Sequence, residues 1–283
     1  MGTILNIRPL AGLLILACSS CDIFEFRGFF LSYENANERF TQSMAWNNIN
    51  PYKEITTGQD NYLIYVMADS HTGTTYNLNY FFRNAIENNA VSAVMVGDLT
   101  TGHAVDYKVF YDALPDRDEL LTFPVAGNHD IYFDGWKQFH SLFGTSTYLF
   151  YVKTPEGTDL FICLDTAGGT LGDLQYNWLS KILKTQRPDY RRCIIFTHNN
   201  ILQFRKIATT TPNPEELYAL KELFIEHRVD MVITGHDHQK DYREFGGTKY
   251  ISLDALVDGY KFAGFMKLMV NDGNLSFEHF NLP

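Results

Sequence analysis

Basic residues are scarce in this chain. Its 283 residues include 23 Lys and Arg against 33 Asp and Glu, which gives a formal net charge of −10 and a pI near 5.3. Proteins that bind duplex nucleic acid usually gather Lys and Arg into patches that neutralise phosphates. We therefore expect no nucleic-acid duplex as a partner. An acidic protein can still bind a small phosphate compound if its site holds cations.

Cysteine is also rare, and the chain has no internal repeat or low-complexity segment. With 45% hydrophobic residues, the chain is long enough for one sizeable core and needs no disulfide or metal to fold. Cys163 and Cys193 fall in predicted buried strands, where small buried thiols are common. An exported protein could instead oxidise them to a disulfide, so the sequence leaves both states open.

The hydrophobic run at the N-terminus, residues 10–17, is too short to span a bilayer. It follows a short segment with one positive side chain, Arg8, and ends at Ala17-Cys18, before two serines. This resembles the lipobox of bacterial lipoproteins, which implies a signal peptide over residues 1–17 and a membrane anchor through a lipid on Cys18. An ordinary cleaved signal peptide and an uncleaved anchor are the alternatives. All three predict an exported protein, either periplasmic or at the cell surface.

From Tyr62 onward, apolar runs that predict strands alternate with amphipathic segments that predict helices. Predicted strands cover residues 62–68, 93–96, 122–126, 148–152, 160–165, 193–196 and 231–233. Predicted helices cover residues 76–89, 106–114, 136–143, 174–185 and 214–227. Four further strands are expected at 242–245, 249–253, 262–270 and 275–280. This order predicts an α/β fold in which two sheets pack face to face with helices outside.

Residues 18–60 show no strong period. We interpret them as a tether and an N-terminal extension that packs on the main domain, residues 61–283.

Five of the predicted strands end in short polar clusters. The opening strand, for example, runs from Tyr62 into Asp69-Ser70-His71. The other clusters are Gly97-Asp98, Gly127-Asn128-His129-Asp130, Thr197-His198 and Gly235-His236-Asp237-His238. Ligands of open α/β sheets bind at this edge, where the ends of several strands meet. Three clusters begin with glycine, which lets the backbone turn sharply and approach a ligand closely.

The clusters contain seven side chains that can bind a metal through carboxylate, amide or imidazole groups. They are Asp69, His71, Asp98, Asn128, His198, His236 and His238. Without thiolates, this mixture favours borderline divalent ions such as Mn, Fe or Zn. Seven ligands are too many for one open ion but suffice for two ions that share a carboxylate. Two ions about 3.5–4 Å apart can activate water for displacement at phosphorus.

In residue type and order the clusters resemble the five motifs of the calcineurin-like metallophosphoesterase family, from Tyr62 to about His238. The resemblance implies a four-layer fold, a β-sandwich flanked by helices, and a metal-dependent phosphatase or phosphodiesterase. The implied roles are as follows: Asp69, His71 and His238 bind the first metal, Asp98 bridges, and Asn128, His198 and His236 bind the second metal. By the same resemblance, His129 protonates the leaving oxygen and Asp130 orients His129.

Two positions depart from the family pattern. Thr101 stands where many members have Asp, and no Pro follows His198 in Thr197-His198-Asn199-Asn200. Neither change removes a predicted ligand. His103 follows Asp98 closely; we expect a solvated loop residue and leave it out of the site.

Alone, each cluster residue also fits an ordinary role, such as a strand-end cap or a turn. Five clusters together favour an enzyme that hydrolyses small-molecule or lipid phosphoesters. Monoesters and diesters both stay open, because loops such as residues 72–75, 102–106 and 203–214 set the choice of substrate. The alternative function is a non-catalytic metal-binding surface module that binds a partner or a glycan.

Overall fold

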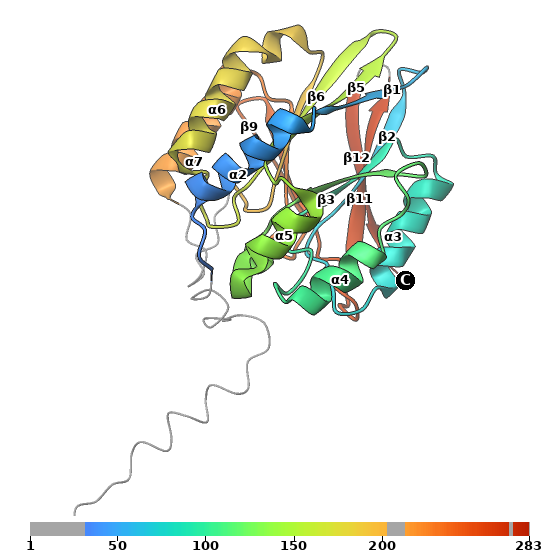
Figure 1. The fold of residues 1–283 in the computed structure, drawn as a ribbon. Coiled ribbons are helices and arrows are strands. Elements are labelled where there is room, and N and C mark those ends of the chain that lie inside the picture. Colours follow the sequence, from blue (N-terminus) through green and yellow to red (C-terminus); the bar gives the residue numbers. More distant parts are fainter. Residues whose placement is uncertain (1–31, 203–212, 272–273, 283) are drawn as a thin grey trace, which may run out of the picture.

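The computed structural model describes residues 32–202, 213–271 and 274–282 (Figure 1). The predicted signal peptide and Cys18 lie outside the described residues, as does most of the predicted 203–214 loop. Among the helices that are described, none is long and apolar enough to cross a membrane.

The smaller sheet has five strands in the order β12-β11-β2-β3-β4. Its strands are β2 (Tyr62–Met67), β3 (Ser92–Val96), β4 (Leu121–Val125), β11 (Gly264–Asn271) and β12 (Asn274–Asn281). Strands β2, β3 and β4 are parallel, so their carboxyl ends meet at one edge. Strand β11, from the C-terminal part of the chain, pairs antiparallel with β2 on the other side.

The larger sheet has seven strands in the order β1-β5-β6-β7-β8-β10-β9. Its strands are β1 (Lys53–Thr56), β5 (Tyr148–Thr154), β6 (Gly157–Leu164), β7 (Cys193–Thr197), β8 (Met231–Thr234), β9 (Asp241–Phe245) and β10 (Thr248–Ser252). Strands β6, β7, β8 and β10 are parallel to one another. Their carboxyl ends form a second edge of the same kind.

Three apolar cores separate four layers. Between the sheets, Phe150 stacks on Phe123 and Phe161 with ring centroids 3.9 and 4.6 Å apart. The outer helices are α3 (Tyr76–Glu87), α4 (Ala104–Asp112) and α5 (Gly135–Phe143) on the smaller sheet, and α6 (Gly172–Thr185) and α7 (Pro214–Glu226) on the larger sheet. Two 3-10 helices cover His129–Asp134 and Arg187–Asp189. The predicted α/β sandwich with flanking helices is confirmed.

The segment before Tyr62 contains a helix and a strand that the sequence pattern did not predict. Helix α2 (Ala36–Ile49) begins with a capping box between Asn35 and Glu38. Its buried side chains include Arg39, which pairs with Asp165 at 2.8 Å. Because polar contacts hold much of this helix in place, its apolar residues do not recur at helical spacing. Strand β1 joins the larger sheet by pairing with β5.

Cys163 and Cys193 are both buried free thiols. Burial raises the pKa of each thiol to about 12, so both are protonated at neutral pH. The sequence allowed either a disulfide or free thiols, and the structure has the free thiols.

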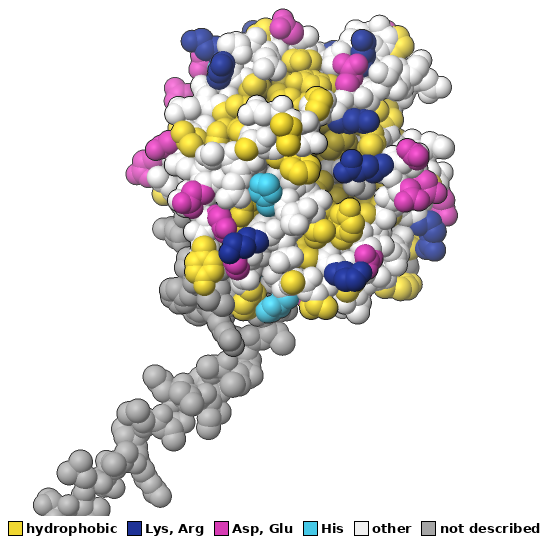
Figure 2. All heavy atoms as spheres, in the orientation of Figure 1, with side chains coloured by type: hydrophobic (Ala, Val, Ile, Leu, Met, Phe, Trp, Pro, Cys, Tyr) yellow, Lys and Arg dark blue, Asp and Glu magenta, His cyan; other side chains and the backbone are white. Residues whose placement is uncertain are grey.

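The surface is mixed in character. On the face in Figure 2, Lys and Arg side chains alternate with Asp and Glu in small groups, and apolar side chains cover larger areas between them.

Candidate metal centre

The polar clusters lie where the carboxyl ends of the two sheets come together. From the larger sheet, Nδ1 of His198 contacts the Val96 carbonyl oxygen at the end of β3, at 2.9 Å. The backbone N–H of His236, just after β8, donates to the Asp69 carboxylate at 2.9 Å. Asp69 is in turn tied to the next strand end, because its N–H donates to the Gly97 carbonyl at 3.0 Å. The site therefore spans both sheets.

The glycines that open three of the clusters make room for the predicted ligands themselves. A Cβ on Gly97 would overlap the ring of His198, and one on Gly127 would overlap Asp98. A Cβ on Gly235 would meet the Asp69 carboxylate. The sequence predicted a close approach of these glycines to a ligand, and the structure instead places each of them against a predicted ligand residue from a neighbouring strand end.

Left-handed backbone is concentrated at the site. Nine non-glycine residues in the described ranges have a positive φ, and five of them are predicted metal ligands. These five are Asp69, His71, Asp98, His236 and His238, with φ between 38° and 70°. Such conformations are unfavourable for residues with a Cβ and persist where the surrounding structure enforces them, often at functional sites.

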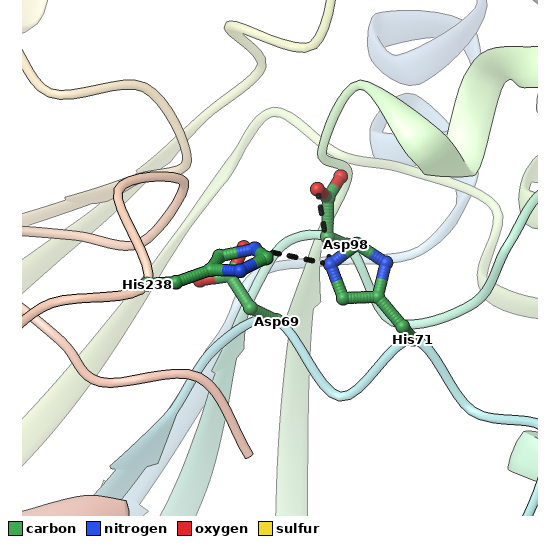
Figure 3. Close-up of side chains that lie close together, drawn as sticks. All are labelled: Asp69, His71, Asp98 and His238. Atoms are coloured by element: carbon green, nitrogen blue, oxygen red, sulfur yellow. Dashed lines mark hydrogen bonds and ion pairs between the residues drawn. The ribbon is translucent and has the colours of Figure 1, made fainter. Parts of the chain in front are cut away.

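Asp69, His71, Asp98 and His238 form the first group of possible ligands (Figure 3). Each offers one ligand atom, and these atoms lie within 4.8 Å of one another. Nε2 of His238 is 3.3 Å from Asp69 Oδ1 and 3.2 Å from Nε2 of His71. Nε2 of His71 is also 3.7 Å from Asp98 Oδ2. The group corresponds to the predicted first-metal ligands plus the bridging carboxylate.

Asp98 also belongs to a second group, with His198 and His236. Nε2 of His198 is 3.3 Å from Asp98 Oδ2. The rings of His198 and His236 have centroids 5.2 Å apart. Asp98 is thus the shared member of two adjacent groups, as a bridging ligand would be.

Asn128 is the seventh predicted ligand. It is buried, and its Nδ2 donates to the Tyr132 hydroxyl at 3.1 Å. Its Oδ1 is buried without a hydrogen-bond partner, whereas Nε2 of His198 is buried and lies 3.3 Å from Asp98 Oδ2. A buried acceptor without a partner is costly. Both atoms are of the kind that binds a divalent ion, so the residues present fit a two-metal centre.

The carboxylates and imidazoles shift one another's protonation. Burial would raise the pKa of Asp98, but His198 and His129 outweigh it and hold that pKa well below its usual range. Burial would also raise the pKa of Asp69, but the nearby imidazoles, chiefly His238, outweigh burial and lower that pKa. Both groups are therefore ionised at neutral pH, as metal ligands must be.

The imidazoles of the site differ in the direction in which their pKa values are shifted. Burial lowers the pKa of His71 and of His236 to about 4, so both are neutral at pH 7. Burial would also lower the pKa of His198, but the Asp98 and Asp69 carboxylates raise it to about 10. Without metal, His198 holds a proton that a bound cation would displace.

His129 lies beside the first group. Its ring is edge-on to His71, with centroids 4.5 Å apart, and its backbone N–H donates to Asp98 Oδ1 at 2.8 Å. Asp98 therefore positions the predicted acid through the backbone as well as facing the ligand groups.

Asp130 has a structural role that the sequence did not predict. Its carboxylate accepts from the backbone N–H groups of Leu99, Thr100 and Gly127 at 2.9–3.1 Å. It thereby fastens the loop after β3 to the segment that carries His129. Burial and the Asp98 charge raise the pKa of Asp130 to about 7. Its predicted role in orienting the His129 ring stays a prediction.

Tyr132 was not among the predicted site residues. Its hydroxyl supports the amide of Asn128, and its ring is 4.9 Å from that of His129. Its place in the sequence, four residues after Asn128 in the same polar cluster region, gave no signal of this contact.

The chain was compared with families of known proteins. Residues 62–240 match the calcineurin-like phosphoesterase family. No curated protein matches the chain. The match covers more than half of the sequence, and the chain belongs to this family.

Several solved structures share the fold at 14% sequence identity, a level that shows the fold alone. GAP50 of Plasmodium, described as the anchor in the inner membrane complex, has a TM-score of 0.63 over 79% of this chain and 85% of its own. A dimetal phosphatase from Danio rerio has a TM-score of 0.58 over 77% and 95%. A purple acid phosphatase from yellow lupin has a TM-score of 0.60 over 79% of this chain and 52% of its own.

Family membership and the candidate metal site together support a metal-dependent phosphoester hydrolase.

Proposed function

We propose that the chain hydrolyses phosphoesters outside the cytoplasm with two divalent ions. The observation that carries the proposal is the pair of ligand groups that share Asp98, together with the buried Asn128 Oδ1, which has no hydrogen-bond partner. Asp69, His71 and His238 would hold one ion, and Asn128, His198 and His236 the other. When bound, such ions activate water and neutralise charge on phosphoryl oxygens. Mn, Fe and Zn all suit this donor set.

Beyond metal binding, His129, Asp130 and Asn128 have further roles at the site. His129 would donate a proton to the leaving oxygen, and the Asp98 carboxylate holds its backbone in position. Asp130, bound to three backbone amides, keeps the two loops together. The Asn128 amide, fixed by Tyr132, would lie beside the phosphoryl group. Both monoesters and diesters, of small molecules or lipids, fit this chemistry.

The proposed location is supported by the sequence alone. A lipid on Cys18 would anchor the protein in a bacterial membrane facing the periplasm or the outside. We expect radioactive palmitate to label the wild-type chain in cells and not Cys18→Ala. Labelling of both proteins, or of neither, would contradict the lipid anchor.

A non-catalytic binding module is the second candidate. It is favoured by the likeness to GAP50, an anchor protein with the same fold. An anchor has no need of seven possible ligands beside His129, and the donor set therefore favours the enzyme.

Assays of p-nitrophenyl phosphate and bis-p-nitrophenyl phosphate hydrolysis by the full-length chain distinguish the enzyme from the binding module. We expect turnover with added Mn or Zn and none with a chelator, and the ratio of the substrates should distinguish a monoesterase from a diesterase. Two bound metals with no turnover of any phosphoester would favour the binding module. A chain that binds no metal would contradict the site itself.

A further inference from the structure

Two rings from different loops are stacked beside His129. His103, which directly precedes α4, lies on Phe133 with ring centroids 4.1 Å apart and planes inclined by 20°. His103 is exposed and Phe133 is half-buried. One face of the pair is therefore open to a ligand.

The loop of His103 is packed tightly against the segment that carries His129. A Cβ on Gly102 would lie 2.6 Å from the carbonyl oxygens of both His129 and Tyr132. The N–H of Gly102 donates to Thr100 Oγ1 at 3.0 Å, and Thr100 is itself bound to Asp130. These contacts hold the backbone next to His103 against the segment that carries His129.

The other ring is held in an unfavourable backbone conformation. Phe133 and Asp134 are consecutive non-glycine residues with φ of 55° and 62°. The side chain of Phe133 is half-buried and packs against the core between the smaller sheet and its helices, so part of its ring stays accessible. Strain of this kind is often found where a side chain must be presented for function.

Successive ring contacts lead from the metal ligands to Tyr132, the residue before Phe133. His238 is 5.2 Å from His71, His71 is 4.5 Å from His129, and His129 is 4.9 Å from Tyr132. Phe133 follows Tyr132 directly. The stacked pair thus belongs to the His129 side of the centre. If His129 protonates the leaving oxygen, the leaving group lies on that same side.

We propose that the exposed face of His103, supported by Phe133, binds a planar aromatic ring in the leaving group of the substrate. The favoured substrates are then phosphoesters of alcohols that carry an aryl group or a nucleobase. This inference rests on the proposed phosphoesterase function. Stacking on one ring changes binding by about 2- to 10-fold, which is large enough to set a preference between substrates.

The test uses two substrates that differ only in ring planarity. 2-Phenylethyl phosphate and 2-cyclohexylethyl phosphate have leaving oxygens of similar basicity, so His129 serves both equally. We expect the full-length, metal-loaded chain to prefer the phenyl ester in kcat/KM by about 2- to 10-fold. His103→Ala should bring the ratio close to one, whereas His103→Phe should keep it. Tyr218→Ala, which removes an exposed ring on α7, is the matched control and should not change the ratio.

A binding measurement separates this proposal from the proposed function. Calorimetry with the non-hydrolysable 2-phenylethyl and 2-cyclohexylethyl phosphonates should show the same preference and the same response to His103→Ala. Preference in binding without hydrolysis of any ester would support the ring subsite and contradict the enzyme. Hydrolysis with a ratio near one in the wild type, or a ratio that persists in His103→Ala, would overturn the subsite. A comparison of adenosine 5′-monophosphate with ribose 5-phosphate then distinguishes a nucleobase from a simple aryl group.

Discussion

Two clusters of buried acid lie at opposite ends of the same β-sandwich. Tyr62, the first residue of β2, donates to Asp159 at 2.7 Å, whereas Asp69 lies two residues beyond Met67, the last residue of that strand. Asp159 also accepts two hydrogen bonds from Arg191, at 3.0 and 2.7 Å. Its charge is therefore neutralised by a permanent partner. At the other end, Asp69 and Asp98 face imidazoles instead of arginine, and Asn128 Oδ1 of the same site is buried without a hydrogen-bond partner.

The difference indicates what each cluster is for. A buried carboxylate that is matched by arginine and tyrosine has its partners within the fold, and removing one partner would leave an uncompensated buried charge. A pair of buried carboxylates that shares several imidazoles has donor atoms left over, which a divalent cation can use. Burial and charge alone do not distinguish the two ends, but the identity and completeness of the partners do.

We expect the largest effect from Asp98→Asn, at the metal-binding end of the sandwich. Asp98 is the shared member of both ligand groups, so we expect loss of bound metal and a fall in phosphoester turnover of roughly 10³-fold or more. Elemental analysis of the purified protein and hydrolysis of p-nitrophenyl phosphate measure the two effects. A variant that keeps two metals would show that Asp98 does not bridge them.

His129→Ala tests the part of the site that is not a predicted ligand. We expect metal content to stay at the wild-type level and turnover of esters with poor leaving groups to fall by about 10²- to 10⁴-fold. The effect should be smaller for p-nitrophenyl phosphate, because its leaving group needs little protonation. Equal losses for both kinds of ester would contradict the role of His129 as a general acid.

Asp159→Asn is the matched change at the structural end. It removes the charge that Arg191 and Tyr62 face, so we expect a loss of about 2–4 kcal/mol in the free energy of unfolding. Urea denaturation measures this loss. Metal content should stay unchanged, and a fall in metal content would mean that the two ends are not independent.

Two Tyr→Phe changes remove one tyrosine hydroxyl at each end of the sandwich. Tyr132→Phe removes the hydroxyl that accepts from the Asn128 amide, next to a predicted ligand atom. Loss of such an outer-shell contact commonly lowers metal affinity by about 10- to 100-fold. We expect weaker binding of one of the two ions in a calorimetric titration. Two ions bound as tightly as in the wild type would contradict the assignment of Asn128 as a ligand.

Tyr62→Phe has the smallest expected effect. It removes one hydrogen bond to the Asp159 carboxylate, and we expect a loss of about 1–2 kcal/mol in stability with no change in metal binding. Burial and the Asp159 charge raise the pKa of Tyr62. The contribution of a group with a raised pKa is present below its unfolded pKa, about 10, and falls as pH rises above that value. The stability difference between wild type and Tyr62→Phe should therefore shrink above about pH 10, and a constant difference would contradict this linkage.

The sequence predicted the fold closely where burial imposes a simple period. Strands such as β7, predicted at 193–196 and found at Cys193–Thr197, are continuous apolar runs covered on both faces. Helix α2 was not predicted, because its burial depends on Arg39 and a partner 126 residues away in the sequence. Only the Asn35–Glu38 capping box could have indicated where it begins.

Local sequence specifies which side chains stand at the strand ends, and hence the candidate metal ligands and the chemistry of the class. Strand ends are fixed by local apolar runs, and that information is present in the sequence. The left-handed backbone of five predicted ligands, the support of Asn128 by Tyr132, and the bonding of Asp130 to backbone amides depend on the three-dimensional fold. These features arise from contacts between loops of different strands, and such contacts exist only after the two sheets have packed together.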